Sequence, residues 1–140
     1  MTAAVLDTSA LIALFRGHPG VASASRTLER IVLPAVALGE VLVGRLGYQR
    51  TAGKGRGKPG GLPEIRAFLA SPRVQVAGLG AETAERYALI RDWLRSAGRP
   101  VPTNDIWIAA SAMELGLRII TLDRHYLAIP QIVVDLFEPA

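Results

Sequence analysis

The 140-residue sequence contains no cysteine, so disulfide bonds and thiolate metal sites are excluded. It also lacks any uninterrupted apolar run of roughly 18 to 20 residues, the length that a membrane-spanning helix needs. The first seven residues lack the basic opening of a signal peptide. These absences favour a cytoplasmic protein, and a hydrophobic content of 50% predicts one compact domain over residues 1–140.

Lysine is also scarce, and arginine supplies most of the basic residues in a chain of net charge +4. No acid occurs between Glu40 and Glu64, and this interval holds five basic residues, Arg45, Arg50, Lys54, Arg56 and Lys58. Glycine and proline dominate residues 51–61, which predicts a flexible loop. A solvated surface explains a modest charge excess, but the clustering indicates RNA-binding residues.

Short apolar runs alternate with segments of helical periodicity along the whole sequence. Strands are expected over residues 3–7, 31–33, 74–79, 118–122 and 132–134. Helices are expected over residues 8–17, 21–30, 36–47, 63–70, 81–97 and 103–115. This alternation predicts an α/β sandwich around a mainly parallel sheet.

Two acids end expected strands, and a third begins an expected helix. Asp7 and Asp123 follow strands, and ligands of open parallel sheets bind at the carboxyl ends of the strands. The helix that Asp105 begins is about 15 to 18 Å long. The returning strand covers a similar length of about 20 Å, so Asp105 and Asp123 are expected at the same edge of the sheet.

Glu40 is placed by its helical neighbours, since the residues three and four positions away, Val36, Ala37, Val43 and Gly44, are apolar or small. We therefore expect Glu40 on the inward face of its helix. Four buried carboxylates would repel one another unless a cation held them together. Oxygen ligands suit Mg²⁺ or Mn²⁺, and such an ion activates water for attack on a phosphodiester.

Simpler explanations exist for three of these acids taken singly. Asp105 could only favour the dipole of its helix, and Asp7 or Asp123 could only cap the next helix. Thr8, Asn104 and Thr121 are expected to support the carboxylates or their bound waters.

The other polar and aromatic candidates are expected to carry no chemistry. We expect His18 and His125 to have surface or structural roles. Ser9 has no histidine partner at a suggestive position, so a hydrolase triad is unsupported. Packing is the expected role of Trp93 and Trp107.

The pattern resembles the PIN-domain ribonucleases, most of all the VapC-type toxins of toxin–antitoxin pairs. The matching segments are residues 5–11, Glu40, residues 104–110 and residues 120–123, in the right order. The resemblance implies a three-layer α/β/α sandwich and Mg²⁺- or Mn²⁺-dependent endoribonuclease activity. It also implies a homodimer, a cognate antitoxin, and Asp7, Glu40, Asp105 and Asp123 as the catalytic and metal-binding acids.

Two other classes of protein are alternatives to a nuclease. Phosphoryl transfer through an aspartyl phosphate is disfavoured, because residue 9 is serine and both lysines lie in the loop rather than on a late strand. A non-catalytic PIN-like module that binds RNA or protein remains the alternative, although such modules can lose acids that this chain keeps.

Overall fold

The computed structural model describes residues 2–52 and 61–140, and it contains one five-stranded sheet in the order β3-β2-β1-β4-β5. Every pair of neighbouring strands is parallel. The strands are β1 (Ala3–Leu6), β2 (Arg30–Pro34), β3 (Val74–Ala77), β4 (Ile119–Thr121) and β5 (Val134–Leu136). The expected α/β class with a parallel central sheet is therefore confirmed.

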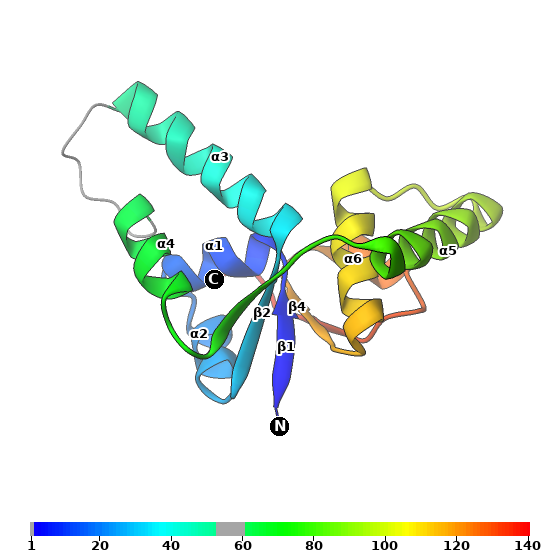
Figure 1. Cartoon of the computed structure of the whole chain (residues 1–140), viewed down its shortest axis with the longest axis horizontal. Helices are drawn as coiled ribbons and strands as arrows, with labels where there is room; N and C mark the ends of the chain where they lie inside the picture. The colour runs from blue at the N-terminus through cyan, green and yellow to red at the C-terminus, as the bar shows by residue number, and fades with distance from the viewer. Residues whose placement is uncertain (1, 53–60) are drawn as a thin grey trace.

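Helices cover both faces of the sheet and make three layers (Figure 1). The first four are α1 (Thr8–Phe15), α2 (Pro19–Arg26), α3 (Ala35–Ala52) and α4 (Leu62–Leu69). The later ones are α5 (Ala81–Ala97), α6 (Thr103–Leu115) and the short 3₁₀ helix η1 (Arg124–Ala128). Both α5 and α6 have the bounds that the sequence predicts, since each ends before a glycine of positive φ, Gly98 or Gly116.

The alternating side chains of the strands build two separate cores. Val5, Val32 and Ile119 point to the face covered by α5, α6 and η1. Their neighbours Leu6 and Ile120 point to the opposite face, where they pack with residues of α1, α2, α3 and α4. Both faces are therefore buried, which explains why the central strands read as continuous apolar runs.

The chain reverses its direction of travel across the sheet between β1 and β4. Strands β1, β2 and β3 follow one another outward with α1–α4 as connections, and the chain then crosses back to place β4 beside β1. In such open parallel sheets, ligands bind at the carboxyl ends of the strands beside this switch point. Asp7 and Asp123 lie there, one at the residue after β1 and the other two residues after β4.

Several boundaries differ from the prediction. The last strand begins at Val134, and the expected strand at 132–134 is wrong because Val133 is exposed and pairing starts with Ile119 opposite Val134. Helix α2 starts at Pro19, where the His18 side chain accepts from the Val21 backbone N–H, and it ends at Arg26 rather than at residue 30. Helix α3 continues to Ala52, and the rest of the expected loop, residues 53–60, lies outside the described residues.

Candidate active site

Asp7 is held at the end of β1 by three neighbouring groups. The Ser9 hydroxyl and the Ala10 backbone N–H both lie 2.8 Å from Asp7 Oδ1. The Thr121 hydroxyl donates to Asp7 Oδ2 at 2.7 Å, because the pairing of Leu6 with Ile120 brings the ends of β1 and β4 side by side. Thr121, expected to support the carboxylates, therefore contacts Asp7, and Asp7 also caps α1.

Burial strongly affects the Asp7 carboxyl, which is 2% exposed. Loss of hydration raises its pKa from 3.8 to about 6, while the bonds from Thr121, Ala10 and Ser9 lower it and the charge of Asp105 raises it. Three donors make four contacts with the two carboxylate oxygens, since the Ser9 hydroxyl also lies 3.0 Å from Oδ2.

Asp105, on the first turn of α6, faces η1. The Asp105 Oδ2 atom lies 3.1 Å from His125 Nδ1, and the Tyr126 hydroxyl donates to Oδ1 at 3.4 Å. The placement of Asp105 beside Asp123 confirms the length argument, because His125 Nδ1 is also 3.0 Å from Asp123 Oδ1. The Asp123 carboxylate accepts from the His125 backbone N–H as well, so it caps η1.

Charge couples the four acids, although they come from separate elements. Burial raises the pKa of Asp105, the contact with His125 lowers it, and the charges of Asp123 and Glu40 raise it. Asp105 in turn raises the pKa of Asp7. Of the four predicted acids, Asp105 and Asp123 lie together in one group with His125, while Asp7 and Glu40 lie outside that group and interact with Asp105 through charge.

Glu40 is placed differently from the way the sequence indicates. It is exposed rather than inward-facing, and Val43 on the same face is 72% exposed. The inward face of α3 runs instead through Ala37 and Val41, which are 0% and 2% exposed. Glu40 is positioned by the Thr8 hydroxyl, which donates to Glu40 Oε1 at 2.7 Å.

Three residues of the site are missing from the sequence prediction. His125 joins Asp105 and Asp123 in a group whose possible ligand atoms all lie within 4.8 Å of one another. Ser9 contacts Asp7 and accepts from the Leu122 backbone N–H. The third is Tyr126, which is fully buried, and burial raises its pKa, so it stays a hydroxyl donor to Asp105.

A common signal could have identified Ser9 and His125. Each lies two residues after an acid that ends a strand, where side chains and backbone N–H groups turn back to cap the next helix. His18 keeps the structural role expected for it, since its Nε2 contacts the Glu138 carbonyl oxygen at 2.7 Å. Trp107 also packs as expected, stacked on Tyr87 with ring centroids 4.0 Å apart.

The remaining predicted residues lie outside this cluster. Asn104 is exposed, and among residues 2–52 and 61–140 no hydrogen bond joins it to the carboxylates. Arg45 is 7% exposed because it lies one turn after the buried Val41, so the exposed basic surface does not include it. Arg50 is exposed near the end of α3. The other basic residues, Lys54, Arg56 and Lys58, lie outside the described residues.

The donor set fits a hard divalent cation. It consists of carboxylate oxygens and one imidazole nitrogen, and the mutual repulsion that raises the pKa of Asp105 is relieved by a cation. Fold and site together define an α/β protein with an acidic cluster, suited to such a cation, at its topological switch point.

The chain belongs to the PIN-domain family, whose model matches residues 4–131. Ribonuclease VapC4 of Mycobacterium tuberculosis is 32% identical to it over 99 residues, which are 71% of each chain. The crystal structure of VapBC2 from Rickettsia felis, bound to a DNA fragment from its promoter, superimposes with a TM-score of 0.79 at 19% identity over 97% of this chain and 99% of that one. VapBC-5 from Mycobacterium tuberculosis, a member of the VapBC family of toxin–antitoxin systems, gives a TM-score of 0.68 at 24% identity over 99% and 100%.

Proposed function

We propose that this protein is a metal-dependent endoribonuclease and the toxin of a toxin–antitoxin pair. The observation that carries the proposal is the group of Asp105, Asp123 and His125 at the switch point of the sheet, with the buried Asp7 at the end of the neighbouring strand β1. Membership of the PIN-domain family and similarity to ribonuclease VapC4 support the same activity.

Asp7, Asp105 and Asp123 are the residues that would hold Mg²⁺ or Mn²⁺, with Glu40 at the exposed rim. When bound, such a cation supplies an activated water and neutralises charge on the phosphate. In the hydrolysis, the water oxygen bonds to phosphorus, the bond to the leaving oxygen breaks, and that oxygen takes a proton. Thr121 orients Asp7, and His125 and Tyr126 orient Asp105 for this step.

The basic residues of the predicted RNA footprint stay a prediction. Arg50 is exposed at the end of α3, and together with Lys54, Arg56 and Lys58 it would add positive charge along the path of a bound strand. Neutralising these four should flatten the salt dependence of RNA binding, and an unchanged slope would remove them from the footprint.

A cognate antitoxin and a second copy of the chain are the proposed protein partners. VapBC-5 of Mycobacterium tuberculosis belongs to a family of toxin–antitoxin systems, which supports the first. Exposed apolar side chains on α3, Val43 at 72% and Leu46 at 53%, give either partner an apolar surface to cover. In the described residues no helix is long and apolar enough to cross a lipid bilayer.

The decisive experiment replaces Asp105 by Asn and measures cleavage of a mixed RNA pool with Mg²⁺, with Mn²⁺ and with EDTA. We expect the wild type to cleave only with a divalent cation, and Asp105→Asn to lose at least about 100-fold in rate, as removal of one charged group at a metal centre does. Asp92→Asn is the matched control, because Asp92 is an exposed acid on α5. RNA binding without cleavage under every metal condition would favour the non-catalytic module instead.

A further inference from the structure

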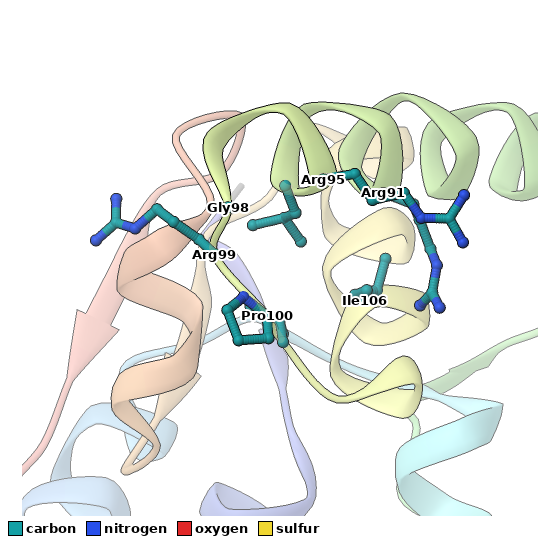
Figure 2. A pocket seen from close by; sticks show the side chains of 8 residues that line it. Arg91, Arg95, Gly98, Arg99, Pro100 and Ile106 are labelled. Carbon is teal, nitrogen blue, oxygen red and sulfur yellow. The ribbon is translucent and has the colours of Figure 1, made fainter.

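A pocket of about 320 Å³ opens between the end of α5, the connection that follows it and the first turn of α6 (Figure 2). It has an apolar floor and a basic rim. Its floor and rim are formed mainly by Leu94, Val101, Ile106, Arg91, Arg95 and Arg99. We refer to it as the arginine pocket.

The three arginines recur every four residues, and their guanidinium groups lie on two sides of the pocket. Figure 2 shows Arg91 and Arg95 on one side and Arg99 on the other, with Pro100 and Ile106 between them. Among residues 2–52 and 61–140, no acidic side chain forms an ion pair with any of the three. The pocket therefore presents uncompensated positive charge around an apolar surface.

Arg91 is fixed in place by neighbouring groups. Its guanidinium carbon lies 5.9 Å from the centroid of the Tyr87 ring, and its Nη1 donates to the Thr103 hydroxyl at 3.4 Å. Tyr87 in turn stacks on Trp107 of α6. An arginine held in this way loses less side-chain entropy when it binds an anion, so the contacts prepare the pocket for a ligand.

The chemistry of the pocket fits a nucleotide better than an ion alone. Guanidinium groups bind phosphates through paired donors, and an unstacked base packs on apolar side chains or on an arginine plane. Guanidinium groups on opposite sides of an apolar floor suit a nucleotide whose base lies on the floor and whose two flanking phosphates reach the two sides. An acidic peptide would satisfy the rim, but nothing in its carboxylates requires the apolar floor.

The pocket also adjoins the acidic cluster. Ile106 lines the pocket and directly follows Asp105 in the chain, so the Cα atoms of the two residues are about 3.8 Å apart. The first turn of α6 therefore separates the two sites. We propose that the arginine pocket binds one nucleotide of single-stranded RNA next to the cleavage site, an assignment that rests on the proposed function.

The test compares RNA binding by Arg95→Gln/Arg99→Gln with that of the wild type. The probe is a pool of fluorescently labelled single-stranded oligoribonucleotides of random sequence, titrated in EDTA at several NaCl concentrations so that binding is separated from cleavage. We expect the affinity of the double variant to fall at least about tenfold, and its salt slope to fall by about 1.4, since each phosphate contact on a single strand contributes about 0.7.

The matched control is Arg26→Glu, which changes the net charge by the same amount as the double variant. Arg26 is exposed at the end of α2, ahead of β2 and so at the opposite edge of the sheet from the acids. Its affinity and salt slope should equal those of the wild type. If the double variant does not fold, Arg99→Gln alone, in the connection beyond α5, should lower the slope by about 0.7.

The outcomes separate this proposal from the proposed function. Wild-type RNA affinity in the arginine variants, with metal-dependent cleavage intact, would overturn the pocket assignment and leave the nuclease in place. If the arginine variants keep the RNA affinity of the wild type but lose its binding of an acidic peptide, the pocket assignment would be overturned in favour of a protein partner. If the arginine variants lose RNA binding and the wild type never cleaves RNA, the result would support the pocket and refute the nuclease. A wild type that binds no RNA would refute the pocket.

Discussion

Replacement of Asp7 by Asn should stabilise the metal-free protein at neutral pH and have no such benefit in acid. Burial lifts the pKa of Asp7 from 3.8 to about 6, which corresponds to about 3 kcal/mol at 1.36 kcal/mol per pKa unit. Asp7 is 2% exposed, so solvent screening does not reduce this energy appreciably. The folded state therefore opposes ionisation of a group that the unfolded chain ionises freely.

The sign of the pH dependence follows from the folded-state pKa lying above the unfolded one. Below pH 3.8 the carboxyl is protonated in both states and contributes nothing. Between pH 3.8 and about 6 only the unfolded state loses the proton, so the free energy of unfolding falls as the pH rises. Above that range the loss is complete and constant. Asn does not titrate, so its advantage over Asp appears across this window.

The assay is urea denaturation in EDTA at a series of pH values between these limits. The free energy of unfolding of Asp7→Asn, relative to the wild type, should rise by about 2 to 3 kcal/mol from the acid to the neutral end. Against this gain stands a pH-independent loss of about 1 kcal/mol, because the amide nitrogen of Asn cannot accept the hydrogen bond that Thr121 donates to Asp7 Oδ2. The same variant should lose metal-dependent cleavage.

Asp92→Asn serves as the control, because Asp92 is exposed and its replacement should leave the pH profile of stability unchanged. A stability difference between Asp7→Asn and the wild type that is the same at every pH would refute the reasoning. It would mean that the Asp7 carboxylate is solvated or compensated in the folded state.

Thr121→Val should remove the hydroxyl that donates to Asp7 and accepts from the Asp123 backbone N–H, lowering the free energy of unfolding by about 1 to 3 kcal/mol. Because the Thr121 bond lowers the pKa of Asp7, the acid limb of the pH–rate profile should move to higher pH, whereas a limb that stays in place would contradict this role. Arg73→Gln should lose the bonds from Nη1 to the carbonyl oxygens of Ser25 and Leu28, lowering the free energy of unfolding by about 1 to 2 kcal/mol. Its specific cleavage rate should match the wild type below the melting transition, and a lower rate would assign Arg73 to the site.

The parts of the fold that could be read from the sequence are those set by local chemistry. The bounds of α5 and α6 follow from apolar periodicity and from Gly98 and Gly116, which adopt positive φ at the helix ends. The bounds of β5 do not, because a run of apolar residues indicates a strand without giving its register. That register is set by the pairing of β5 with β4, in which Ile119 lies opposite Val134, and this pairing is not local.

The acids divide in the same way. Asp105 could be placed because its helix and the strand that returns from it have similar expected lengths. The start of the helix and the end of the strand therefore lie at the same edge of the sheet. Glu40 could not, because the apolar residues around it do not show which side of α3 packs on the sheet, and Ala37 and Val41 take that side. The local signal at His125, two residues after Asp123, likewise does not show that this side chain meets a second acid. Its side chain meets Asp105 only because η1 packs against the first turn of α6.

Helix capping and a place at the acidic site turn out to be compatible for Asp7 and Asp123. Each carboxylate caps the helix that follows it, as the simpler explanation holds. Capping fixes the side chain through one backbone N–H, at Ala10 or at His125, and leaves lone pairs of the carboxylate available. The cap therefore orients the acid at the end of its strand, and the burial and mutual repulsion of the acids then make a cation the natural ligand.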